Sequence, residues 1–250
     1  MRALASPSVG IVHGDSVLHF TRSPDDGLSP PGYRHAPVLT ALAEQTDRPH
    51  ESLIDAGLKW QLVPERLYGY DYRRDYLRSS YPNVSDEIGV TAVPSVGALG
   101  IFERTPGIPA GVDADHHLCE LLVETAAGMR DRRPPHYAMA FFTGAATWVV
   151  LYRGGHLVHA QGQASNRPAD AVFFLAALLQ QFGIDREEAP LLVGGALTEE
   201  GQLFRELGMY FQTDAIAEAT DASAPATQLL LAYGRALRSG LFPLSRSPEA

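Results

Sequence analysis

The sequence contains very little cysteine, and no signal peptide or membrane span can be recognised in it. Cys119 is the single cysteine, so an internal disulfide is excluded and a reducing compartment is expected. Residues 1–10 lack an apolar core of signal-peptide length, and no run approaches the ~20 apolar residues that cross a bilayer. We therefore expect a cytoplasmic protein without a membrane span.

Positive charge is also scarce. The chain has 20 basic and 29 acidic residues, which gives a net charge of -9, and Lys59 is its only lysine. Basic residues cluster only at 130–133, whereas binding to nucleic-acid phosphates requires a concentrated positive face. The composition therefore excludes nucleic acid as the expected partner. The 45% of hydrophobic residues suffice for one or two cores in a chain of 250 residues.

The clearest pattern of secondary structure runs from residue 137 to residue 195. Residues 138–142 and 147–152 are β-rich runs, and the small residues at 143–146 between them predict a hairpin. Residues 156–160 alternate as a third strand does. Residues 171–182 form a helix that is apolar nearly all round, so we expect it to be covered on both sides, and Gly183 ends it. A buried strand at 190–195 then runs into a glycine turn.

The remaining elements are predicted by the same signals, and residues 23–58 are the part that we place least well. Asp115 is expected to cap the helix at 118–129, Thr198 to cap a helix that Gly208 closes, and residues 131–135 to link two halves. The other expected elements are an opening hairpin (9–12 and 17–20), helices at 37–45, 65–79 and 225–239, a short helix or turn through 102, and strands at 59–63, 89–93, 108–112 and 209–211.

The order strand, strand, strand, helix, strand is the first half of the repeating unit of the actin-like ATPase fold. Between residues 60 and 211 the chain resembles a bacterial protein family, known mainly from Bacteroidetes, that has this fold and no established activity. The matching segments are 60–68 (WQLVPERLY), 90–94 (VTAVP), 149–157 with its Arg-Gly-Gly turn, 170–175 (DAVFFL), 192–195 (LVGG) and 203–207 (LFREL).

The resemblance implies an α/β protein with a duplicated actin-like ATPase (ribonuclease H-like) fold, in two lobes that each contain a mixed sheet flanked by helices. We expect residues 1–132 to form the first lobe, residues 133–244 the second lobe, and residues 245–250 a frayed tail. In this alignment of the two halves, residues 90–94 correspond to residues 191–195.

The resemblance also shows where ATP chemistry would lie. Nucleotide-binding members of this fold cradle phosphates on two glycine-containing turns, and aspartates beside those turns hold hydrated Mg²⁺. In the first turn Asp15 follows Gly14 instead of preceding it, and in the second turn phenylalanine (Phe141 or Phe142) stands where the aspartate is expected. No carboxylate occurs between Tyr137 and Ala169. We therefore expect no metal site, no catalytic residue and no cofactor, with ATP as the less favoured alternative.

Four residues are candidates for residual nucleotide binding: Gly194, Gly195, Gly144 and Thr143. The first two lie in a segment that resembles the adenosine loop of the fold, where glycine lets the backbone approach a nucleoside. The alternative interpretation is a strand-to-helix turn that needs a positive φ, and with only two glycines we favour it.

Two histidine groups suggest metal ligation at first sight. His116 and Cys119 share a helix face, but no second pair completes the three or four ligands that zinc needs. His156 and His159 lie an odd number of residues apart on a strand, so they point to opposite faces. We assign both groups structural or surface roles.

Tyrosine and arginine crowd residues 66–81. Packed rings beside solvated arginines are one interpretation, and a partner surface with Tyr68, Tyr70, Arg73 and Arg74 is the other, because tyrosine and arginine are enriched in interface hot spots. The sequence thus predicts a non-catalytic actin-like scaffold or adaptor with a protein partner or self-association. The alternative is a nucleotide-binding enzyme, such as a small-molecule kinase or ATPase, that uses the inter-lobe cleft, the two glycines at 194–195 and a carboxylate such as Asp15 or Asp170.

Overall fold

The computed structural model describes residues 8–13, 16–23, 27–28, 36–37, 51–105, 116–129, 134–144, 146–165, 167–197, 201–220 and 224–238. Several sequence predictions lie outside these residues: Gly14, Asp15, the cap residues Asp115 and Thr198, the basic cluster at 130–133, the helix from 38 onward, the strand at 108–112 and the tail.

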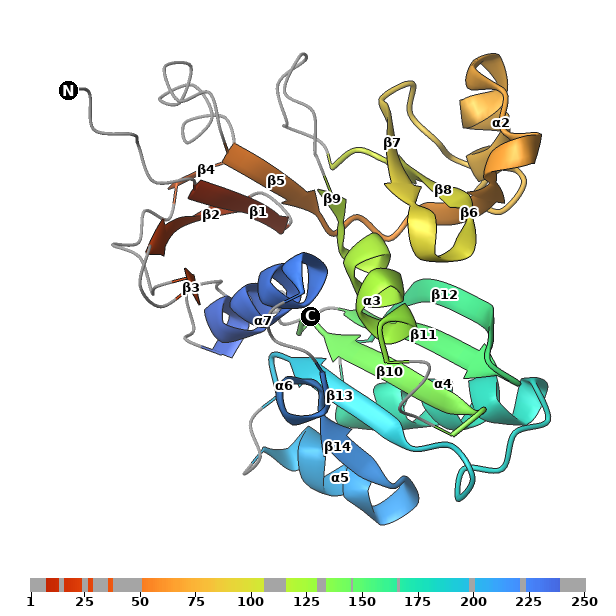
Figure 1. The fold of residues 1–250 in the computed structure, drawn as a ribbon, viewed down its shortest axis with the longest axis vertical. Coiled ribbons are helices and arrows are strands. Elements are labelled where there is room, and N and C mark those ends of the chain that lie inside the picture. Colours follow the sequence, from red (N-terminus) through yellow and green to blue (C-terminus); the bar gives the residue numbers. More distant parts are fainter. Residues whose placement is uncertain are drawn as a thin grey trace, which may run out of the picture.

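A five-stranded sheet forms from the segment with the clearest sequence pattern (Figure 1). Its strand order is β12-β11-β10-β13-β14. The strands are β10 (Tyr137–Phe142), β11 (Ala146–Arg153), β12 (His156–Ala164), β13 (Leu191–Gly195) and β14 (Thr213–Ala215). The first three pair antiparallel, while β13 pairs parallel with β10 and β14 parallel with β13, so the sheet is mixed as predicted.

Helices cover both faces of this sheet (Figure 1). On one face α4 (Pro168–Gln181) and α5 (Gln202–Tyr210) pack on Ala138, Ala140 and Phe142 of β10. On the other face α3 (Leu118–Ala127), α6 (Ile216–Ala219) and α7 (Pro225–Arg238) pack on the alternate side chains of the same strand, beginning with Tyr137. The alternation of a strand therefore separates two hydrophobic cores.

One face of α4 is left open, contrary to the expectation that this helix is covered on both sides. Ala171, Leu175, Leu178 and Leu179 are buried against the sheet and α5, but Phe173 is 76% exposed. The sheet lies on one side of the helix only, so an apolar sequence all round the helix axis leaves apolar side chains in solvent.

The end of α5 was also predicted wrongly. Gly208 does not close the helix, which continues to Tyr210, and the strand expected at 209–211 lies instead at Thr213–Ala215. Gly208 is exposed and no atom would meet a Cβ there, so the helix passes through it at the modest cost of an exposed glycine, about 1 kcal/mol.

A second sheet has the order β3-β2-β1-β5-β9, with β4 (Ala36–Pro37) also paired to β2. Its strands are β1 (Ser8–His13), β2 (Ser16–Ser23), β3 (Gly27–Leu28), β5 (Glu51–Asp55) and β9 (His116–His117). The antiparallel pairing of β1 and β2 confirms the predicted opening hairpin. The strands β5 and β9 run parallel to β1, so this sheet too is mixed.

A three-stranded antiparallel sheet, of order β6-β8-β7, is inserted between β5 and β9. It contains β6 (Trp60–Pro64), β7 (Ile88–Val93) and β8 (Ala98–Glu103). The helix expected at 65–79 is split into the 3-10 turns η1 (Glu65–Leu67) and η2 (Tyr70–Tyr72) and the helix α2 (Arg73–Arg78). Where a helix or turn was expected through 102, the 3-10 turn η3 (Pro94–Val96) is followed by a strand.

This insertion corrects the alignment of the two halves. Residues 90–94 do not correspond to residues 191–195, because β7 belongs to the inserted sheet and pairs antiparallel with β8. The counterpart of β13 is β5, because β5 pairs parallel with β1 as β13 pairs parallel with β10. β5 lies within residues 23–58, the part that the sequence placed least well. In the described part of the chain, no helix combines the length and the hydrophobicity needed to cross a membrane.

Candidate functional site

The turn between β10 and β11 is the first candidate for ligand binding, and it is closed by its own side chain. The Thr143 amide donates to the carbonyl of Ala146 at 3.0 Å, and the Thr143 hydroxyl lies 3.2 Å from the Ala146 amide, from which it accepts. Thr143 is buried, and Gly144 takes the positive φ of 90° that the turn needs. The amide and hydroxyl of Thr143 are therefore engaged within the turn.

The glycines at the end of β13 have packing reasons of their own. Gly195 has a φ of 92°, and a Cβ at this position would clash with the backbone of Phe142 on the neighbouring strand. The Ala196 amide donates to the carbonyl of Phe142 at 2.7 Å. A Cβ on Gly194 would lie 2.8 Å from Ile216. The backbone of Phe142 therefore requires glycine at position 195, whereas at position 194 a Cβ would meet only the flexible end of the Ile216 side chain; nucleoside contact by either glycine stays a prediction.

A cavity of about 290 Å³ nevertheless lies between these two candidates, at the edge of the sheet where β10 and β13 end. The hairpin contributes Phe142, Gly144 and Ala146, and the segment after β13 contributes Ala196 and Leu197. The remaining lining residues come from the starts of α4 and α5 and from the loops before them: Ser165, Arg167, Pro168, Ala171, Gly201, Gln202 and Leu203. The structure therefore brings Gly144 near the residues that follow Gly195.

The described residues that line the cavity are mostly apolar, and one of them, Arg167, is a cation. None of its described lining residues is acidic, and Arg167 is the charged residue among them. Its guanidinium contacts both carboxylate oxygens of Asp170, at 3.1 and 3.3 Å. Asp170, one of the carboxylates considered for Mg²⁺, is thus paired with an arginine and does not line the cavity. Among the described lining residues, no carboxylate supplies the oxygen ligands that Mg²⁺ requires.

The histidines considered for metal binding contact different groups. A register shift pairs His159 with Leu151 and His156 with Arg153, two residues apart on β11, so the two histidines share a sheet face and the prediction of opposite faces is wrong. His116 contacts Glu120 at 2.9 Å, and Cys119 is buried, where burial and the nearby Glu120 raise the pKa of its thiol. His156 is exposed, whereas His159 lies beside the rings of Phe174 and Phe182. The described residues contain no group of three metal-ligating side chains.

Burial lowers the pKa of His159 to about 4. Its Nε2 atom is buried and has no hydrogen-bond partner among the described residues. The aromatic neighbours supply no acceptor for a protonated ring, so His159 is neutral in the folded protein at physiological pH.

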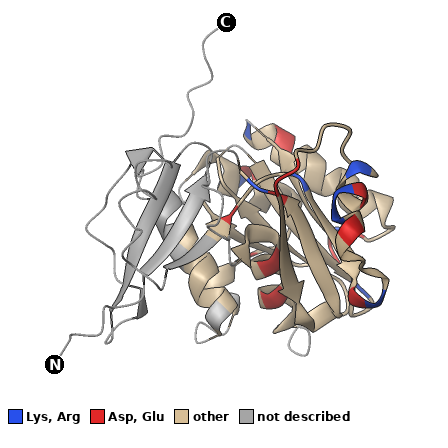
Figure 2. Cartoon of the chain, turned by 90° about the horizontal axis from the view of Figure 1, so that it is seen from above, with Lys and Arg blue, Asp and Glu red and all other residues tan. Residues whose placement is uncertain are grey.

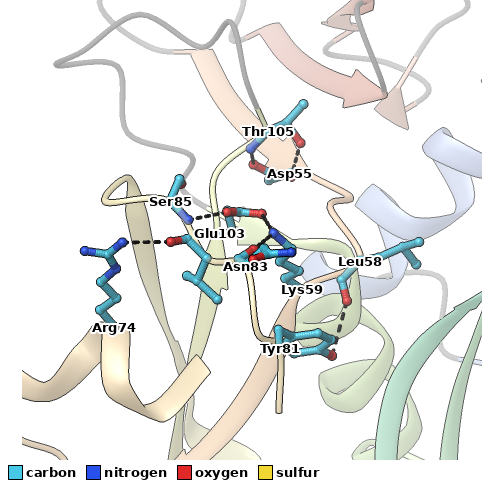
Figure 3. Close-up of polar contacts among 10 residues, drawn as sticks. Asp55, Leu58, Lys59, Arg74, Tyr81, Asn83, Ser85, Glu103 and Thr105 are labelled. Atoms are coloured by element: carbon cyan, nitrogen blue, oxygen red, sulfur yellow. Dashed lines mark hydrogen bonds and ion pairs between the residues drawn. The ribbon is translucent and has the colours of Figure 1, made fainter. Parts of the chain in front are cut away.

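The sequence analysis missed a buried polar centre where β5 meets β9. The Asp55 carboxylate is inaccessible to solvent and accepts a hydrogen bond from the Gly57 amide (2.8 Å). It also accepts from the Thr105 amide (2.8 Å) and the Thr105 hydroxyl (2.7 Å) (Figure 3). Its Cα partner in the sheet is His117. Three donors from the chain itself satisfy this carboxylate, so it anchors the inserted sheet and is not free for a ligand.

His117 caps α3 in the position expected for Asp115. Its Nδ1 accepts from the Cys119 amide at 3.1 Å, so its Nε2 carries the proton and donates to the Gly57 carbonyl at 3.0 Å. The Glu120 carboxylate accepts from the His117 amide and completes a capping box. The ring stacks on Trp60 at 4.5 Å, and burial lowers the His117 pKa. A histidine before an apolar helix is a weak cap signal, which explains why it was overlooked.

The tyrosine-rich segment divides into packed and exposed rings. Tyr76 donates to the Leu67 carbonyl at 2.7 Å and stacks on Tyr68, while Tyr81 donates to the Trp60 carbonyl. The exposed part, which we call the η1–η2 surface, consists of Leu67, Tyr70 and Tyr72, which are 61%, 67% and 62% exposed.

Arg73 and Arg74 of this segment make different kinds of contact. Arg73 lies over the Tyr70 ring, 4.3 Å from its centre. Arg74 donates to the Val84 carbonyl at 3.0 Å (Figure 3). It also pairs with Asp86, and the two contacts fix the loop that leads to β7. Basic and acidic residues lie interspersed over the described part of the chain (Figure 2).

Comparison with solved structures identifies the fold. A Bacteroides thetaiotaomicron VPI-5482 protein with an actin-like ATPase fold and unknown function superposes with a TM-score of 0.71 at 12% identity, covering 90% of this chain and 96% of that chain. The PilM-PilN type IV pilus biogenesis complex contains a chain that superposes with a TM-score of 0.51 at 13% identity, covering 94% and 96%. No curated protein matches the sequence.

The mixed sheets, the helical layers and these likenesses define an α/β protein with the actin-like ATPase fold. The chain belongs to the family described as "Protein of unknown function (DUF3822)", whose model matches residues 59–213. This match and the Bacteroides structure bear out the resemblance seen in the sequence.

Proposed function

We propose that this protein is a non-catalytic scaffold or adaptor built on a degenerate, duplicated actin-like ATPase fold. The duplication is supported by strand order: in each large sheet an antiparallel hairpin is followed by two strands parallel to its first strand. In this proposal the two large sheets are the centres of the two lobes.

The observation that carries the proposal is the cavity at the edge of the five-stranded sheet. It occupies the side where ligands bind in α/β sheets, yet none of its described lining residues is a carboxylate and its cation is paired with Asp170. Phosphoryl transfer depends on metal ions and positioned charges, and the described lining residues offer no carboxylate to hold Mg²⁺, which supports a non-catalytic role.

Calorimetric titration tests this proposal directly. The full chain is titrated with Mg-ATP and, at matched salt, with ATP and a chelator of divalent cations. We expect no binding tighter than about 1 mM, equivalent to about -4 kcal/mol, in either titration. Micromolar binding that needs Mg²⁺ would show that the metal site exists and would overturn the non-catalytic assignment.

A nucleotide-binding enzyme is the second candidate, because the cavity reaches from Gly144 to the residues after Gly195. A nucleotide held there would contact Ala196, so Ala196→Leu should weaken its binding, while Met209→Leu on α5, outside the cavity, should not. Binding unaffected by both changes would place the nucleotide elsewhere.

For the partner we propose a protein that docks on the η1–η2 surface. Three large side chains are exposed within six residues there, and Arg73 over Tyr70 adds the residue pair that interface hot spots favour. The likeness to a chain of a pilus biogenesis complex makes a role in a protein assembly reasonable. A cytoplasmic location follows, as a proposal, from the single buried cysteine.

A further inference from the structure

The outer face of α4 is an apolar surface that nothing in the described structure covers. Ala169, Phe173, Ala176, Ala177 and Gln180 are all exposed, at spacings that place them on one side of the helix. Phe173 is the most exposed of the large hydrophobic side chains in the described part of the chain, at 76%. We call these five residues the α4 face.

The composition of the α4 face distinguishes it from an ordinary solvent-exposed helix surface. Surface helices normally turn charged and polar residues outward, whereas this face carries one aromatic ring, three alanines and a neutral amide. The one charged residue of α4 is Asp170 in its first turn, which is paired with Arg167. A second protein surface could therefore approach the middle of the helix without burying a charge.

We propose that a second copy of this chain docks on the α4 face, with the two α4 helices antiparallel about a twofold axis. In a twofold interface the contacts are reciprocal: if one residue contacts a second residue of the partner, that second residue contacts the first residue of the partner. With the axis beside residue 175, Phe173 of each copy lies against Ala177 of the partner subunit. The small alanine side chains then leave room for the ring.

The same arrangement suits the charges of the protein. Each copy has a net charge of -9, so an interface that opposed acidic residues would be repelled. In the antiparallel register Asp170 lies opposite Gln180 of the partner subunit, whose amide can donate to a carboxylate. The ring and the alanines thus complement themselves, which favours a second copy over an unrelated partner as the occupant.

The expected dimer is weak. α4 has 14 residues and is about 21 Å long, so one helix face provides less than the ~800 Å² per partner of a standard stable interface. We expect a dissociation constant in the micromolar range. This inference goes beyond the proposed function, because the α4 face is separate from the cavity and from the η1–η2 surface and would act whether or not a nucleotide binds.

Sedimentation velocity of the full chain from about 1 to 300 µM tests the proposal. The wild-type protein should pass from monomer to dimer with rising concentration, whereas Phe173→Lys should remain monomeric at all concentrations. Met209→Lys is the matched control, because Met209 is 70% exposed on α5, outside the α4 face, and its replacement should leave dimerisation unchanged. Circular dichroism verifies that each variant is folded.

A mixing experiment tests the antiparallel register. Ala177→Glu should also be monomeric alone, because two carboxylates then face two phenylalanines. Mixed with Phe173→Lys, it should form a heterodimer that pairs lysine with glutamate and keeps one native Phe173–Ala177 contact. A wild-type protein that stays monomeric at 300 µM, a dimer insensitive to Phe173→Lys, or a mixture that does not associate would each overturn the proposal.

Discussion

The half-buried ring of His159 should make the stability of this protein depend on pH. Burial lowers its pKa to about 4, whereas the ring has a pKa of about 6.5 in the unfolded chain. Well above pH 6.5 the ring is neutral in both states and adds no pH dependence. As the pH falls from 6.5 towards 4, the unfolded chain takes up a proton that the folded protein does not, so stability is lost.

The size of the effect follows from these two values. At pH 5 the unfolded chain gains about 2 kcal/mol from protonation of this ring relative to the folded protein, and the full shift corresponds to about 3 kcal/mol. His159→Phe replaces the ring with one of similar shape among Phe174 and Phe182 and removes the unpaired Nε2. The variant should be at least as stable as the wild type at pH 7.5 and lose about 2 kcal/mol less on transfer to pH 5.

Urea unfolding at pH 7.5 and pH 5.0, followed by the fluorescence of Trp60 and Trp148, measures this difference. His117, whose pKa burial also lowers, contributes in the same direction in both proteins and cancels in the comparison. His156→Gln is the matched control on the same strand, because His156 is exposed. Equal pH dependence of the wild type and His159→Phe, within about 0.5 kcal/mol, would refute the reasoning.

Two further predictions concern a glycine and the η1–η2 surface. Gly195→Ala should lower the free energy of unfolding by more than about 3 kcal/mol or prevent folding, because it adds a backbone clash to a positive φ. Gly154→Ala, with φ 60° and no neighbour within 4 Å, should lower it by about 1 kcal/mol. Equal losses in urea unfolding would contradict the packing argument. The double change Tyr70→Ala and Tyr72→Ala should alter stability by no more than about 0.5 kcal/mol per site yet abolish co-purification with a protein partner, and a partner retained by the variant would show that it binds elsewhere.

Local signals in the sequence were enough to predict most of the five-stranded sheet. Its hairpin joins two β-rich runs through Thr143 and Gly144, and α4 follows β12 within a few residues, so each element is marked by its own composition. The elements that were missed depend on distant partners. β8 contains a glycine at position 100 and lies between β6 and β7 in its sheet. β5 is only five residues long. Pairing with neighbouring strands therefore defines β8 and β5 as strands more than their composition does.

The candidate site was predictable to a similar extent. The structure brings Gly144 near the end of β13 through the parallel pairing of Phe142 with Gly195, as the sequence suggested, whereas the expected absence of a Mg²⁺ site stays a prediction. The centre formed by Asp55 and His117 could not be read, because these residues come together only after the inserted sheet has folded between them. A hydrogen-bonded carboxylate and a stacked imidazole carry no sequence motif of their own.

The helix α7 has a consequence for how the chain is made. It contacts α3, β13 and β3, and Leu230 and Tyr233 within it are completely buried in the core on one face of the five-stranded sheet. Because a ribosome releases the amino-terminal part first, both large sheets emerge before the helix that fills the core against α3. The nascent protein therefore exposes the apolar faces of α3 and β10 until α7 has also emerged from the ribosome.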